Sequence, residues 1–585
     1  MRQFIIEATY IFAALFLFGL SGLGAVLVLV RQSRFVLLAS PLAGILLVNL
    51  VSLGVYSSLH LALGHAAAIG GSVCLFSSGA YVIISSPRIA KRDLIFSGFC
   101  LISISIAYAF LSCYASIMNG DVSLLFTEGT DQFGYANVAD WMRDHAPTAF
   151  PFKDAPAVSE NLPYQSFPNI MLGYEPRMGA FAFLGIVGWL RSVPSTFAYD
   201  TASAVFLAAG VLGVTAVFAK NYFTCLILVL GLMASDWLDF THAGFLGKAL
   251  AYPSLLFLLG IFFQTSESSQ DALSTLLLML LAASIGMLLS GTVAAGLIII
   301  FCGGSVLIEC YHSRRFKVSK GVTIAMMAFG AAFASGGLAR PLNSNIPISL
   351  DDINLVMHRS LDLRGWTTFT GTNNFGLAVA ISLGFVLGSV AILNRMSAPC
   401  VMLLGSSLFL PILIAVHAKS ELMQLSGFLY PAMLCGGIML VSNEGNLSHQ
   451  ARVACLVSIL VLIGLRLPRA VAAGKHSTDR MVVKQTSISL KEIDAVAQTD
   501  SIGGPILVDL GTIQLPVLAL TELGRRNMQL QFTADSWFHA VGGWRGWPVP
   551  KYVEQPKRRL IPVERLQERD VIIFKGNRLA VVGYE

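Results

Sequence analysis

The chain has 585 residues, of which 55% are hydrophobic and only 12% are charged. Soluble domains carry about 25% charged residues, so this composition excludes a soluble globular protein. The formal net charge of +6 does not indicate nucleic-acid binding, because the Lys and Arg residues stand in short loops between apolar runs. We therefore predict an all-α polytopic membrane protein with the lipid bilayer, and no nucleic acid, as a partner.

Apolar runs recur from the N-terminus to residue 467, which bounds a predicted transmembrane domain of residues 1–467. A helix that crosses a hydrocarbon core of about 30 Å needs roughly 20 apolar residues. A further apolar piece at 180–190 is too short to cross, and we interpret it as an interfacial helix. The fourteen predicted spans are 5–30, 36–59, 63–86, 94–118, 197–219, 222–235, 248–265, 272–289, 291–311, 319–337, 376–394, 398–417, 425–441 and 453–467.

The positions of the basic residues orient the predicted spans. The short loops that follow even-numbered spans are nearly free of Lys and Arg, with Lys248 and Lys419 as the exceptions. The basic short loops follow odd-numbered spans, and they contain Arg31, Arg34, Arg88, Lys91, Arg92, Lys220, Arg314, Arg315, Lys317, Arg395 and Arg452. These loops therefore share one face, which the positive-inside rule makes cytoplasmic. Both termini, the loop 236–247 and the larger segments 119–196, 338–375 and 468–585 are then expected on the opposite side.

The first outer loop, 119–196, contains an amphipathic pattern. Apolar or small residues at Tyr135, Val138, Ala139 and Met142 follow helical spacing, and they predict an interfacial helix with Asp131 at its N-cap or first turn. A carboxylate there is either a simple helix cap or a general base at the membrane boundary. The loop's other charged residues, Asp140, Arg143 and Asp144 among them, are interpreted mostly as solvated.

The segment that begins at Asp131 resembles a known family. Residues 131–136 read Asp-Gln-Phe-Gly-Tyr-Ala, similar to the Asp-Glu-x-x-Tyr-Ala pattern of GT-C glycosyltransferases. Aminoarabinose transferases and protein O-mannosyltransferases, which use polyprenyl-phosphate sugars, belong to this superfamily. Residues 173–178, Gly-Tyr-Glu-Pro-Arg-Met, resemble its Tyr-Glu-Lys-Pro-Pro-Leu segment. Gln132 replaces the second acid, and Arg177 stands where the family has a lysine. The resemblance covers about residues 94–265.

The resemblance implies an inverting transfer of one sugar from a polyprenyl-phosphate donor to a glycan, lipid or protein acceptor. The expected place is a bacterial inner membrane, with the active site facing the periplasm. Asp131 is the candidate base and Glu175 a second acid. Candidate phosphate-binding residues are Arg177, Lys248, Arg359 and Arg364, and candidate acceptor or lid residues are Tyr135, His242, His358 and Trp366. No cofactor is predicted with certainty, and a divalent cation stays open.

Several readings remain open from the residues alone. Lys248 also fits a lysine whose ammonium reaches water from an interfacial position. The loop 338–375 is either a lid over the donor or a linker. The competing functions are a glycolipid transporter or flippase, a ligase or polymerase of lipid-linked glycans, and a non-catalytic scaffold for the tail.

The tail, 468–585, is predicted to be a small α/β domain on the non-cytoplasmic side. Strand-like segments occur at 505–510, 528–532, 570–574 and 578–582, and helix-like segments at 490–498 and 515–525. Gly576 and Asn577 form a predicted hairpin turn between the last two strands. Acceptor binding and a structural cap over the membrane domain are both consistent with this pattern.

Overall fold

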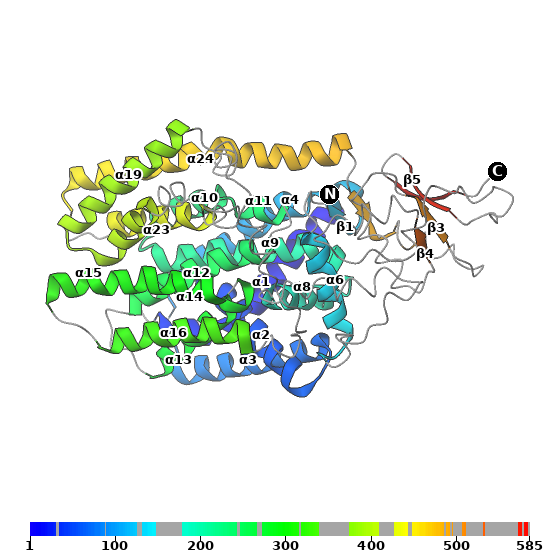
Figure 1. Ribbon diagram of the computed structural model, residues 1–585, viewed down its shortest axis with the longest axis horizontal. Coiled ribbons are helices and arrows are strands. Elements are labelled where there is room, and N and C mark those ends of the chain that lie inside the picture. The colour runs from blue at the N-terminus through cyan, green and yellow to red at the C-terminus, as the bar shows by residue number, and fades with distance from the viewer. Residues whose placement is uncertain are drawn as a thin grey trace, which may run out of the picture.

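The fold is a bundle of helices, most of which run along the long axis of the molecule (Figure 1). The computed structural model describes residues 1–30, 34–87, 89–125, 131–147, 178–242, 246–265, 272–289, 291–314, 318–337, 374–408, 426–442, 447–484, 487–491, 494, 506–509, 530–532, 571–575 and 578–582. All structural statements below concern these residues.

The first half of the chain supplies the helices around the bundle centre. They are α1 (Arg2–Leu29), α2 (Val36–Leu59), α3 (Leu63–Ser85), α4 (Lys91–Ser112), α5 (Tyr114–Asn119), α6 (Asp131–Asp144), α8 (Met178–Arg191), α9 (Ser195–Phe218), α10 (Tyr222–Met233), α11 (Trp237–His242) and α12 (Leu246–Thr265). A short strand, β1 (Ser123–Leu125), lies between α5 and α6.

The second half adds further helices, two of which contain π-helical turns. They are α13 (Ala272–Leu288), α14 (Gly291–Ile298), η3 (Ile299–Gly303), α15 (Gly304–Ser313), α16 (Val318–Gly337), α19 (Asn374–Leu393), α20 (Ser397–Cys400), η5 (Val401–Gly405), α23 (Ser426–Ser442) and α24 (His449–Lys484). The segments η3 and η5 continue α14 and α20 and contact each other.

Among the described residues, nine helices are long and apolar enough to cross a membrane. Each coincides with a predicted span, so a polytopic helical protein is confirmed. The other five predicted spans fall on shorter apolar helices, and the count of fourteen therefore stays a prediction. The apolar piece at 180–190 is α8, whose 14 residues extend only about 21 Å. It packs among α2, α6 and α9 instead of lying against lipid.

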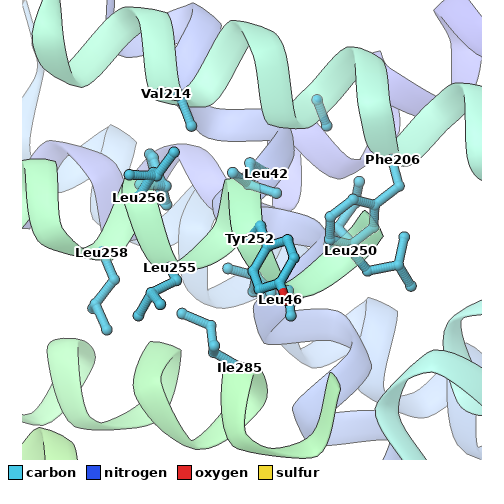
Figure 2. Close-up of a cluster of buried hydrophobic side chains, with 14 of the residues drawn as sticks. Leu42, Leu46, Phe206, Val214, Leu250, Tyr252, Leu255, Leu256, Leu258 and Ile285 are labelled. Atoms are coloured by element: carbon cyan, nitrogen blue, oxygen red, sulfur yellow. The ribbon is translucent and has the colours of Figure 1, made fainter. Parts of the chain in front are cut away.

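The core of the bundle is built around α9 and α12, which are buried along their length. Figure 2 shows apolar side chains of this core, among them Leu42 and Leu46 of α2, Phe206 of α9 and Ile285 of α13. By contrast, α3, α4 and α24 expose large apolar side chains, as helices that face lipid do. The candidate site is therefore carried by elements that pack on the bundle centre.

Two ion pairs lie near the membrane boundaries that the distribution of Lys and Arg predicts. Arg466, next to the outer end of the predicted span 453–467, forms an ion pair with Asp236 of the loop predicted outside. Lys320 pairs with Glu309 beside the predicted cytoplasmic loop at 314–317. Figure 1 shows the N-terminus and β1 toward one end of the bundle and α15 toward the other. Which end faces the cytoplasm remains a prediction.

The described part of the tail has strands at the four places where the sequence predicts them, and one further strand, β2, that the sequence does not predict. They are β2 (Ser487–Ser489), β3 (Ile506–Asp509), β4 (Leu530–Phe532), β5 (Val571–Lys575) and β6 (Arg578–Val582). The last four form a sheet of order β4-β3-β5-β6, in which β3 is parallel to β4 and β5, and β5 is antiparallel to β6. The predicted helices at 490–498 and 515–525 fall almost wholly outside the described residues, so the α/β class of the tail stays a prediction.

Candidate functional site

The amphipathic helix predicted after the first span group is α6, and it begins at Asp131. Tyr135, Val138, Ala139 and Met142 are all buried, which confirms the predicted apolar face. This face packs against α8 and α9, so protein and not lipid covers it. The helix start places the backbone of Asp131 in the first turn, where a carboxylate also suits the helix dipole.

Tyr135 joins α6 to the start of α12. Its hydroxyl oxygen accepts a hydrogen bond from the backbone N–H of Gly247 at 3.2 Å, and its ring centroid lies 5.2 Å from that of Phe181. Asp131 stands four residues before Tyr135, and residues at this spacing share one face of a helix. The structure therefore joins α6, through the Tyr135 side chain, to the residue that precedes Lys248.

Lys248 is buried at the beginning of α12, with only 6% of its surface exposed. A lysine that reaches bulk water would leave its ammonium exposed, so the burial does not fit that alternative. The first turn of α12 also presents backbone N–H groups and the positive end of the helix dipole. Lys248 and the helix start thus lie directly after Gly247, the residue that donates to Tyr135 of α6.

The short helix α11 is fixed at both ends in front of α12. The indole N–H of Trp237 donates to the carbonyl oxygen of Gly427 at 2.9 Å. The hydroxyl of Tyr199 donates to the carbonyl oxygen of Thr241 at 3.1 Å. The predicted acceptor or lid residue His242 is the last residue of α11 and half-buried. These bonds hold the segment that leads into α12 against α9 and α23.

Asp140 corrects the interpretation of the first outer loop as mostly solvated. Its carboxylate is 1% exposed, and Oδ1 accepts a hydrogen bond from the backbone N–H of Ser195 at 2.6 Å. The same oxygen lies 3.2 Å from Nη1 of Arg143, which donates to the carbonyl oxygen of Val193 at 2.9 Å. Asp140 thus caps the start of α9. In the sequence, only the i, i+3 spacing of Asp140 and Arg143 indicates that these two residues form an ion pair.

The other predicted site residues lie outside the described residues. They are Glu175, Arg177, His358, Arg359, Arg364 and Trp366. Within the described ranges, no group of three or more His, Cys, Asp or Glu residues is placed to hold a metal ion. The site that can be described therefore consists of α6, α11 and the start of α12, with Asp131 placed by its backbone and Tyr135 and Lys248 by their side chains.

No protein-family model matches the chain, and no curated protein sequence matches it. The resemblance to GT-C glycosyltransferases thus continues to rest on the residues quoted above and on the order of the elements.

Proposed function

We propose that the protein is a GT-C-like glycosyltransferase. It moves one sugar from a polyprenyl phosphate to an acceptor hydroxyl or amine on the non-cytoplasmic face, in a bacterial inner membrane. The observation that carries the proposal is the 3.2 Å hydrogen bond between Gly247 N–H and Tyr135 Oη. This bond links the helix that begins at the candidate base to the residue before Lys248, the buried lysine that we propose binds phosphate.

We call the contact between α6 and the start of α12 the junction. The reaction assigns one role to α6 and another to the start of α12. The acceptor oxygen or nitrogen attacks the anomeric carbon of the sugar, and Asp131 takes the proton that the acceptor loses. The bond between that carbon and the phosphate oxygen breaks on the opposite face, which inverts the configuration. Polyprenyl phosphate then leaves with the electron pair, and Lys248 with the first turn of α12 stabilises its charge.

The location of the junction also favours a lipid-linked donor. The isoprenoid tail of such a donor stays in the bilayer, so its phosphate can react only near a membrane boundary. α6 and the start of α12 belong to segments predicted outside, where they follow and precede membrane spans. A base and a cation at this depth meet the donor where its polar group lies.

The test is sugar transfer by the full-length protein in proteoliposomes. The donors are a panel of polyprenyl-phosphate monosaccharides, and mass spectrometry detects the released polyprenyl phosphate. We expect Asp131→Asn to lower kcat by at least roughly 100-fold, the scale of general-base catalysis, without weakening donor binding. Lys248→Met should weaken donor binding and raise KM.

Asp144→Asn is the matched control, because Asp144 is an exposed acid in the last turn of the same helix. It should retain wild-type turnover. Full activity in Asp131→Asn would remove the proposed base. Donor lipid that crosses the bilayer with no transfer product would assign the protein to the flippases instead.

A further inference from the structure

Two short strands from distant parts of the chain pair at one end of the bundle (Figure 1). β1 and β2 run antiparallel, with Ser123 opposite Ser489 and Leu124 opposite Ile488. The pairing continues beyond the strands, because the N–H of Leu490 donates to the carbonyl oxygen of Val122 at 2.8 Å. The N–H of Lys491 donates to Oδ2 of Asp121 at 3.1 Å. We call residues 121–125 and 487–491 the clasp.

The β1 side of the clasp is anchored to the membrane domain. The hydroxyl of Ser116 in α5 donates to the carbonyl oxygen of Ser123 at 3.1 Å and accepts from its N–H at 3.0 Å. The amide of Asn119 donates to Oγ of Ser123 at 3.1 Å. Leu124 is fully buried. One edge of β1 therefore binds α5, and the other binds the tail.

The position of the clasp along the chain links it to the candidate site. β1 ends at Leu125, and α6 begins at Asp131. Six residues reach at most about 20 Å when fully extended, so an anchor at Leu125 restricts where Asp131 lies. On the other side, β2 follows directly after α24, which ends at Lys484. The clasp thus ties the approach to the candidate base to the end of the last membrane helix.

The same helix, α24, also contacts the segment that leads through α11 to the start of α12. Arg466 forms a buried ion pair with Asp236, the residue before α11. Its guanidinium lies 4.9 Å from the ring centroid of Tyr430, whose hydroxyl donates to the carbonyl oxygen of Leu462 at 3.1 Å. The segment that leads to Lys248 is therefore held by α24, as the segment that leads to Asp131 is held by β2.

We infer that the region from α24 to β2 is a positioning element of the candidate site. It sets the place of the first turn of α6 relative to the start of α12, and none of its residues touches substrate. The activity readout rests on the proposed function, whereas the geometry can be tested without any donor. A tail that only capped the bundle would not need to complete a sheet with the strand before Asp131.

The first experiment uses the alternation between hydrogen-bonded and non-hydrogen-bonded residue pairs along an antiparallel pair of strands. The bond from Leu490 to Val122 makes their pair hydrogen-bonded, so the pair Leu124–Ile488 is hydrogen-bonded as well, and the pair Leu125–Ser487 is not. Ile488→Pro therefore removes a donor from the ladder. Ser487→Pro is the matched control, because its N–H points away from β1 and proline is tolerated at the first residue of a strand.

The geometric readout is amide hydrogen exchange of residues 135–138 in the full-length protein in nanodiscs, because in a helix their N–H groups donate to the carbonyl oxygens of residues 131–134 in the first turn of α6. We expect Ile488→Pro to accelerate exchange by about tenfold or more, and Ser487→Pro to leave it unchanged. Equal protection in the two proline variants would overturn the inference, whether or not the protein transfers sugar. If the two variants show this difference but the wild-type protein transfers no sugar, only the proposed function would be contradicted.

The second experiment separates positioning from folding. Ser123 and Ser489 form a non-hydrogen-bonded pair, the close spacing that suits a disulfide. S123C with S489C should cross-link on mild oxidation, whereas S123C with I488C should not, because neighbouring strand residues point to opposite faces. In the Ile488→Pro background, oxidation of the first pair should restore turnover that reduction removes. Turnover that stays low after cross-linking would show that the clasp does not position the site.

Discussion

At the scale of single residues, the buried charge of Glu7 is tolerated because its carboxylate has several partners. Glu7 in α1 is fully buried and forms an ion pair with Arg191 at the end of α8. Its Oε2 accepts a hydrogen bond from the hydroxyl of Thr201 at 3.2 Å, and Oε1 accepts one from the amide of Gln3 at 2.9 Å. A buried carboxylate without such partners would cost several kcal/mol.

The pair of Glu7 and Arg191 gives a prediction for stability. Glu7→Gln leaves the guanidinium of Arg191 buried without a counter-charge, so the free energy of unfolding should fall by about 3–5 kcal/mol. Asp144→Asn is the control, because Asp144 pairs with Arg143 at a surface where its side chain is 45% exposed, and such pairs contribute under about 1 kcal/mol. Thermal unfolding in detergent compares the two. Equal shifts would mean that the buried pair adds nothing to stability.

At the scale of helices, α1 and α2 cross with their backbones in contact. A Cβ atom built on Gly44 would lie 1.8 Å from the carbonyl oxygen of Phe18, and one built on Gly22 would lie 2.3 Å from the N atom of Gly44. In lipid, helices gain no hydrophobic free energy by associating, so close packing through small residues stabilises the pair. These two glycines therefore specify the crossing.

Adding one methyl group tests this crossing. Gly44→Ala forces the two backbones apart, and overpacking of this kind costs about 1–3 kcal/mol or more. Gly54→Ala in the same helix is the matched control, because no atom lies within 4 Å of its Cβ position, and alanine favours a helix over glycine by about 1 kcal/mol. We expect a lower melting temperature and lower yield for Gly44→Ala only. Similar stability of both variants would rule out a tight crossing.

At the scale of the whole molecule, the sequence predicts features that depend on local periodicity. Within the described residues, helices appear where apolar runs predict spans, and the buried face of α6 at Tyr135 and Met142 follows from helical spacing. Features that depend on distant partners were not predicted. Asp140 is buried because it caps α9 at Ser195, and β1 exists because residues 487–489 pair with it. Neither partner can be read from the neighbouring sequence.

The sidedness of the chain joins local charge bias to these distant contacts. The bias predicts that the N-terminus, the first outer loop and the tail share one side, and the β1–β2 pairing requires the last two to do so. The basic loop that includes Arg314 is predicted on the opposite side. The clasp joins Ser123–Leu125 to Ser487–Ser489. An odd number of membrane spans between these segments would put them on opposite sides of the membrane, where they could not pair.

Labelling of cysteines from one side of the membrane tests this arrangement. Arg2, Arg314 and Lys491 are all exposed, so each accepts a cysteine that a maleimide can reach. An impermeant maleimide added to intact spheroplasts should label Arg2→Cys and Lys491→Cys, and it should label Arg314→Cys only after permeabilisation. The unsubstituted protein controls for native cysteines, of which all the described ones except Cys310 are buried. Labelling of Arg314→Cys in intact spheroplasts would reverse the orientation and place α6 and Lys248 on the cytoplasmic side, away from a periplasmic acceptor.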